Sequence, residues 1–189
     1  MKIILGSQSA GRKRVLEQMG YDFEIVPADI DEKAIRFSDP RELTLALARA
    51  KAQALLKKLT EPALLITSDL VVQWSDRILE KPAGPDQARE FLRGYATAPA
   101  KIVASVVITD ISSGKHLEGV EEATVHFRPI PENVVETIVS DERTYTQGGG
   151  LSVEDERLKP YIERIDGEIE AIIGLPKKLT QQFLTEMTA

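Results

Sequence analysis

The stretch at residues 3–14 reads IILGSQSAGRKR. Its three leading apolar residues, bounded by Gly6-Ser7, are typical of a short buried strand. The segment 10–19 has helix-forming composition, and Gly20 suits the left-handed position that ends a helix. The chain therefore opens with a strand, a loop of small residues and a helix, and the rest of the sequence repeats this mixture.

Further elements follow from hydrophobic periodicity and turn signals. Strands are predicted at about 23–25, 63–74, 77–80 and 101–111, with a partner strand that ends near 121–127. Helices are predicted at 39–59, 85–94, 131–140 and from 176 onward. Asp166-Gly167 predicts a hairpin between two strands within 162–173. Frequent hairpins favour one α/β domain over 1–189, with a mixed sheet flanked by helices.

Composition excludes several classes of protein. The net charge is −6, which argues against a general binder of nucleic acid or of anionic membranes. There is no cysteine, so thiol nucleophiles, disulfides and cysteine-ligated zinc are excluded. The first apolar run is far too short for a signal peptide or a membrane helix. We therefore expect a soluble, cytoplasmic protein.

The loop 6–9 and the basic residues after it form the first candidate site. Amides at a helix N-terminus, hydroxyls and arginines suit a phosphate group. Gly6 and Gly11 have the separation found in a P-loop, but Arg12 stands where that motif needs Lys, and Lys13 where it needs Ser or Thr. We reject the P-loop. The alternative is an ordinary turn followed by a solvated basic face of a helix.

Asp69 is the second candidate, because it interrupts the apolar run 64–72. An ionised carboxylate in such a run costs several kcal/mol unless it is paired. It indicates a metal, a cation or a catalytic task, and the alternative is a residue that caps a neighbouring turn. Asp31-Glu32, Lys51 and Lys81 add carboxylates for a divalent metal and cations for phosphates, although each alone is typical of a surface.

Taken in order, these pieces resemble the Maf family over nearly the whole chain, and the opening residues resemble its plant-type branch. The shared pieces are Gly6-Ser7-Gln8-Ser9 with Arg12 and Leu16, Asp31-Glu32, Ala50-Lys51-Ala52, Ser68-Asp69, Lys81-Pro82 and Gly174-Leu175-Pro176. Members of the family are nucleoside triphosphate pyrophosphatases, related in fold to the inosine triphosphate pyrophosphatases. The resemblance implies a single elongated domain with a cleft.

The resemblance also implies roles for individual residues. It implies cleavage between the α- and β-phosphates, with Asp69 as the proton acceptor. The implied phosphate-binding residues are Ser7, Ser9, Arg12, Lys51 and Lys81. Glu32 and Asp69 are the implied ligands of a divalent metal, Mg²⁺ with Mn²⁺ as the alternative. Family members are often dimers, so a homodimer is also expected.

Three positions associated with base specificity depart from the dTTP/UTP-selective members. Those members have Arg, Thr and Gln where this chain has Gly11, Leu70 and Glu154. A glutamate is shared with the branch that acts on 7-methyl-GTP, and the loop 148–155 is expected to cover the base. A carboxylate accepts hydrogen bonds from both the N1–H and the amino group of guanine, and 7-methylation adds attractive positive charge. We therefore favour a modified purine nucleotide as substrate.

Two other functions stay open at this point. One is a pyrophosphatase of dTTP, UTP or inosine nucleotides. The other is a nucleotide-binding regulator that has lost catalysis, for which the altered Ala10-Gly11 loop and Leu70 are the sequence arguments. Retention of both the cations and Asp69 argues against the regulator, because a pure binder has no need of a base.

Overall fold

The computed structural model describes residues 2–188, which fall into two compact units. Unit 1 comprises Met1–Leu70, Ala104–Glu121 and Glu170–Ala189. Unit 2 comprises Val71–Val103 and Glu122–Ile169. Three strands contribute residues to both units, so the boundaries fall inside elements of secondary structure rather than in linkers.

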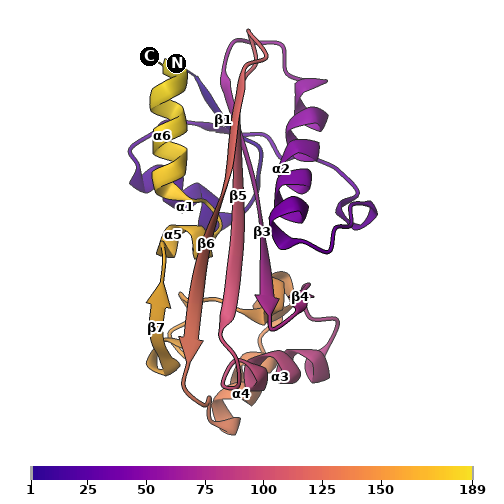
Figure 1. The fold of residues 1–189 in the computed structure, drawn as a ribbon, viewed down its shortest axis with the longest axis vertical. Helices are drawn as coiled ribbons and strands as arrows, with labels where there is room; N and C mark the ends of the chain where they lie inside the picture. Colours follow the sequence, from indigo (N-terminus) through magenta and orange to yellow (C-terminus); the bar gives the residue numbers. More distant parts are fainter. Residues whose placement is uncertain (1, 189) are drawn as a thin grey trace. The chain divides into compact units, whose positions relative to one another are not determined.

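The strands form a mixed sheet, as expected (Figure 1). They are β1 (Ile3–Leu5), β2 (Glu24–Ile25), β3 (Leu64–Trp74), β4 (Arg77–Leu79), β5 (Ala100–Asp110), β6 (His116–Phe127) and β7 (Ile162–Asp166). Their order is β2-β1-β3-β5-β6-β7, and β4 pairs with β3. β1 is parallel to β2 and β3, whereas β4 is antiparallel to β3 and β7 is antiparallel to β6.

The helices match the sequence expectations in most places. They are α1 (Ala10–Gln18), α2 (Pro40–Leu56), α3 (Pro85–Gly94), α4 (Glu132–Val139), α5 (Ile169–Ile173) and α6 (Lys177–Thr188), with 3-10 turns η1 (Glu32–Ala34), η2 (Glu142–Thr146), η3 (Gly148–Gly150) and η4 (Lys159–Tyr161). Asp39 caps α2 as predicted, because its Oδ1 accepts the N–H groups of Arg41 at 2.7 Å and Glu42 at 3.0 Å. Among the described residues, none of these helices is long and apolar enough to cross a bilayer.

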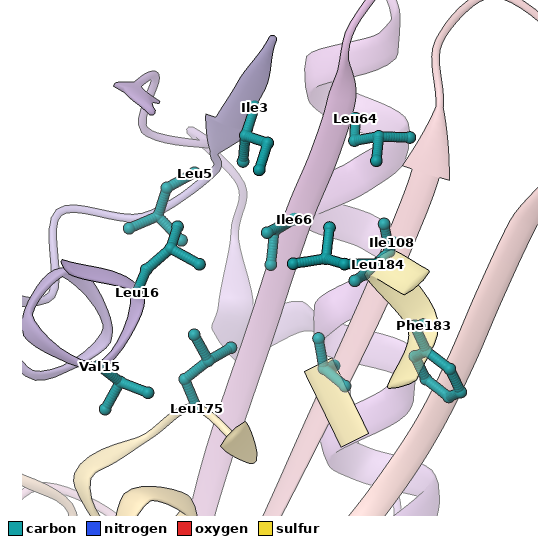
Figure 2. Close-up of a cluster of buried hydrophobic side chains, with 11 residues drawn as sticks. Ile3, Leu5, Val15, Leu16, Leu64, Ile66, Ile108, Leu175, Phe183 and Leu184 are labelled. Atoms are coloured by element: carbon teal, nitrogen blue, oxygen red, sulfur yellow. The ribbon is translucent and has the colours of Figure 1, made fainter. Parts of the chain in front are cut away.

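Unit 1 has three layers, because alternate residues of its strands face opposite sides of the sheet. Ile3, Leu5 and Ile66 face α1 and α6, where they pack with Leu16 and Phe183 (Figure 2). The residues between them in the strands face the other side and pack on α2; they are Ile4, Leu65 and Val107 against Ala48, Ala52 and Leu55. This alternation fixes which side of β3 each following polar residue faces.

Unit 2 has its own core around α3. The Tyr95 ring stacks on Phe127, with 5.6 Å between centroids, and its hydroxyl donates to the carbonyl of Gly149 at 2.7 Å. Burial raises the pKa of this phenol, so it stays a donor. Gly94 lies against Trp74, and a Cβ at that position would come within 2.4 Å of the indole. The half-buried Trp74 therefore packs in this unit.

The hairpin predicted within 162–173 is wrong. β7 ends at Asp166, and residues 169–173 form helix α5 instead of a strand. A short apolar run fits either element, and the deciding signal comes after it. Gly174 has φ +121°, and the N–H groups of Gly174 and Leu175 both donate to the Glu170 carbonyl at 3.0 Å. This glycine-ended helix terminus closes α5.

Candidate active site

The loop between β1 and α1 supplies hydroxyls and amides in unit 1. Ser9 caps α1, and its Oγ accepts the N–H of Arg12 at 3.4 Å. The Ser7 Oγ accepts the N–H of Ser9 at 3.1 Å and a guanidinium N–H of Arg12 at 3.0 Å. The first turn of α1 carries no acidic side chain, so its positive dipole end is not offset there. This is the donor set that an anion such as phosphate requires.

Asp69 lies on β3 with two cations around it. Its Oδ1 accepts from Arg12 Nη2 at 3.3 Å and lies 3.3 Å from Lys51 Nζ. The side chains of Asp69, Arg12 and Lys51 are only 12%, 11% and 9% exposed. A buried carboxylate needs such partners, and here the cations come from α1 and α2. Asp69 thus has the cation partners that a buried carboxylate needs, and its roles as general base and metal ligand stay predictions.

Lys51 joins a second carboxylate to this group. Its Nζ lies 2.8 Å from Oε1 of Glu32, whose side chain is 53% exposed on η1. Glu32 and Asp69 thus approach the same ammonium group from two elements. The structure brings together Ser7, Ser9, Arg12, Glu32, Lys51 and Asp69, all of them from unit 1.

The carbonyl of Gly174 is a further part of this group. It accepts from Arg12 Nε at 3.0 Å and from the fully buried Ser68 Oγ at 2.8 Å. Arg12 is therefore held at Nε by backbone, which leaves its two Nη atoms toward Ser7 and Asp69. The motifs Ser68-Asp69 and Gly174-Leu175-Pro176 mark these residues, but nothing in the sequence alone indicates that one carbonyl joins them.

A divalent metal would find two carboxylates here. Within residues 2–188 no three His, Cys, Asp or Glu side chains gather as a metal site. Mg²⁺ is commonly held by one or two carboxylates together with substrate phosphates, and not by a complete protein cage. Glu32 and Asp69, both in contact with Lys51, fit a metal whose other ligands would come from a bound phosphate.

Gly11 and Leu70 also lie in unit 1, and the structure explains why position 11 is a glycine. A Cβ on Gly11 would come 2.5 Å from the carbonyl oxygen of Ile173 at the end of α5. Glycine is thus required there by the close approach of α1 to α5. Leu70 follows Asp69 on β3 and is half-buried, and strand alternation directs it to the opposite face of the sheet.

Lys81 and Glu154 belong to unit 2. Lys81 is exposed just after β4. Glu154 lines a cavity of about 380 Å³ that is formed by segments 138–157. The loop 148–155 begins with the turn η3, and Gly149 in it donates its N–H to the Glu80 carbonyl at 2.9 Å.

Comparison with known proteins identifies relatives of this chain. The family model described as Maf-like protein matches residues 2–187. The 7-methyl-GTP pyrophosphatase of Dictyostelium discoideum is 42% identical over 98% of this chain and 97% of its own length. The dTTP/UTP pyrophosphatase of Chlamydia trachomatis serovar D is 33% identical over 98% of this chain and 93% of its own.

A solved structure has the same fold. The Staphylococcus aureus Ham1 protein superposes with a TM-score of 0.51 at 13% identity, covering 99% of this chain and 100% of its own. At this identity the likeness concerns the fold alone. The ordered motifs, the mixed sheet flanked by helices and the family model that matches nearly all residues agree, and the chain belongs to the family of Maf-like proteins.

Proposed function

We propose that this protein is a nucleoside triphosphate pyrophosphatase that hydrolyses a modified purine nucleotide, with 7-methyl-GTP as the leading substrate. The products are the nucleoside monophosphate and pyrophosphate. The observation that carries the proposal is the buried Asp69 carboxylate between Arg12 and Lys51. The relative with 42% identity, named a 7-methyl-GTP pyrophosphatase, supports the choice of substrate.

The chemistry assigns the proton to Asp69. The water oxygen forms a new bond to one phosphorus of the α–β linkage while the bond from that phosphorus to the bridging oxygen breaks, and the nucleoside monophosphate and pyrophosphate separate. One proton of that water passes to the Asp69 carboxylate, which acts as general base. Arg12, Lys51 and the Ser7 and Ser9 hydroxyls bind the phosphate oxygens and offset the charge that develops there.

Arg12 and Lys51 serve two states in this account. Without substrate they neutralise Asp69, which removes the cost of an unpaired buried carboxylate. When substrate is bound, the remaining N–H donors of Arg12 and Lys51 bind the triphosphate, and the Asp69 carboxylate is available to the attacking water. Mg²⁺ held by Glu32 and Asp69 would neutralise phosphate charge when bound. Lys81 is assigned to the phosphates by resemblance.

Base recognition is assigned to Glu154 in the cavity of unit 2. A carboxylate there accepts from the two donors that guanine presents, N1–H and the amino group. Uracil and thymine present one N–H between two carbonyls and would leave an acceptor facing an acceptor. The relatives named dTTP/UTP pyrophosphatases make pyrimidine nucleotides the alternative substrates.

The test is a panel of triphosphates assayed with Mg²⁺, with Mn²⁺ and with chelator, in which pyrophosphate and phosphate are quantified separately. We expect pyrophosphate as the product and the highest kcat/KM for 7-methyl-GTP, ahead of GTP, ITP, UTP and dTTP. Preference for UTP or dTTP would select the alternative substrate. Tight binding without turnover of any member would contradict the enzyme and select a nucleotide-binding regulator.

A further inference from the structure

The tripeptide Asp-Glu-Arg occurs twice in unit 2, at 141–143 and at 155–157. Both copies fold alike. The backbone N–H of the arginine donates to the aspartate Oδ1, at 3.0 Å in the first copy and 2.9 Å in the second. The guanidinium then returns to the same carboxylate through Nε and Nη2. Each copy is thus a turn closed by a bidentate ion pair, the strongest geometry for such a pair.

The two arginines differ in reach. The side chain of Arg143 donates through Nε and Nη2 to Asp141, and it is 81% exposed. Arg157 is 29% exposed and bridges the copies, because its Nη2 also donates to Asp141 Oδ2 at 2.9 Å. Its Nη1 donates to the carbonyl of Thr137 in α4 at 3.2 Å. Arg157 therefore ties three segments together.

Glu154 lies between two anchors. On one side Gly149 is held by the Tyr95 hydroxyl at 2.7 Å and by the Glu80 carbonyl at 2.9 Å. On the other side Asp155, the next residue after Glu154, is held by Arg157. Glu154 lines the cavity of about 380 Å³ together with Arg143 of the first turn and all three residues of the second. The Arg157 bridge thus holds the residue next to Glu154 in the segment that lines that cavity.

We propose that Arg157 is a positioning residue for base selection, which fixes Glu154 by bridging the two Asp-Glu-Arg turns. This inference rests on the proposed function. A carboxylate that must meet two donors of a base needs a fixed position, because an error of about 1 Å already weakens such recognition. Arg157 itself touches neither the base nor the phosphates in this account, and it acts through the segment that it holds.

The charge network supports a fixed geometry. The Arg157 guanidinium lowers the pKa of the Asp155 carboxyl, and the Arg143 guanidinium, followed by Arg157, lowers that of Asp141. Both aspartates remain ionised, so the bridge persists at neutral pH. One exposed pair contributes little, but several partners on one planar guanidinium restrict each other.

The experiment measures selectivity as the ratio of kcat/KM for 7-methyl-GTP to kcat/KM for UTP. This ratio does not change when a fraction of the variant's molecules is unfolded, because the concentration of active enzyme cancels. We expect R157Q to lower it about tenfold, mainly through the KM for 7-methyl-GTP. R93Q is the matched control, because Arg93 makes a bidentate pair with Glu132 in the same unit and does not line the cavity; it should stay within about twofold of wild type. R157K keeps the charge but loses the bidentate pair, so it should not restore the ratio.

A double-variant cycle tests whether Arg157 acts through Glu154. In the E154Q background, R157Q should change the ratio by less than about twofold, because the group that it positions is already altered. An unchanged ratio in R157Q, or additive effects in the cycle, would overturn the inference while the pyrophosphatase function stands. A wild-type enzyme that hydrolyses both nucleotides without preference would overturn it too. Absence of any triphosphate turnover would instead refute the proposed function.

Discussion

Gly11 is the position at which packing and specificity meet. A Cβ on Gly11 would lie 2.5 Å from the Ile173 carbonyl oxygen and 2.9 Å from the Ile173 Cγ2. The oxygen belongs to backbone at the end of α5 and cannot rotate away, so α1 or α5 must shift. Overpacking of this kind costs about 1–3 kcal/mol. Alanine in place of glycine in a helix returns about 0.5–1 kcal/mol. With both effects at the middle of their ranges, Gly11→Ala should destabilise unit 1 by about 1 kcal/mol.

Urea unfolding followed by circular dichroism measures this loss, and 1 kcal/mol corresponds to a midpoint lower by about 0.5 M. Gly148→Ala is the matched control, because its added Cβ would meet nothing closer than the Val72 Cγ2 at 3.7 Å. It should stay within about 0.5 kcal/mol of wild type. A Gly11→Ala protein as stable as wild type would refute the close approach of α1 to α5.

The same clash bears on specificity. Gly11→Arg introduces the residue found in dTTP/UTP-selective members, but its Cβ meets the Ile173 carbonyl before its guanidinium can reach a base. We expect this single change not to confer preference for UTP, as measured by the ratio of kcat/KM values. A clean switch to UTP would show that α5 yields easily, contrary to the packing argument.

Three further changes follow from single contacts. Ser68→Ala removes one donor from the Gly174 carbonyl, which also anchors Arg12, so kcat/KM should fall several-fold and the free energy of unfolding by about 1 kcal/mol. Ser68→Thr should restore part of the activity, and equal activity of Ser68→Ala and wild type would contradict this role. Tyr95→Phe leaves the Gly149 carbonyl without its buried donor and should lower the free energy of unfolding by about 1–3 kcal/mol in urea titrations; no loss would argue against that anchor. The pKa of Asp155 is lowered in the folded state, so the stability that its carboxylate contributes is complete above about pH 4, the unfolded value, and is lost as the pH falls through the folded value. The free energy of unfolding, measured from pH 5 to pH 2, should therefore fall less steeply in Asp155→Asn than in wild type. Parallel curves would contradict the ion pair.

Local signals allowed most of the fold to be predicted. Asp39-Pro40 marks the start of α2, and the apolar run with one interrupting carboxylate marks β3 and its candidate base. These features depend on near neighbours in the sequence, such as caps and alternation, and a single chain carries them openly. The pairing of Asp69 with cations was predictable for the same reason, since an unpaired buried carboxylate is costly.

Contacts across the sequence were not predictable. α5 looked like a strand because five residues fit either period, and its glycine-ended terminus decided the matter. The Gly174 carbonyl joins Arg12 and Ser68 from positions far apart in the chain. The bridge from Arg157 to Asp141 likewise depends on how the loop folds back. The homodimer, the cytoplasmic location and the bound metal stay predictions.

In the proposed mechanism Asp69 takes the proton of the attacking water. The direct measurement is pyrophosphate release from 7-methyl-GTP by wild type, Asp69→Asn and Asp76→Asn, the last a control at the exposed turn between β3 and β4. We predict that Asp69→Asn lowers kcat by about 100- to 10,000-fold with an unchanged circular dichroism spectrum, and that Asp76→Asn matches wild type. A folded Asp69→Asn protein that keeps wild-type kcat would contradict the account.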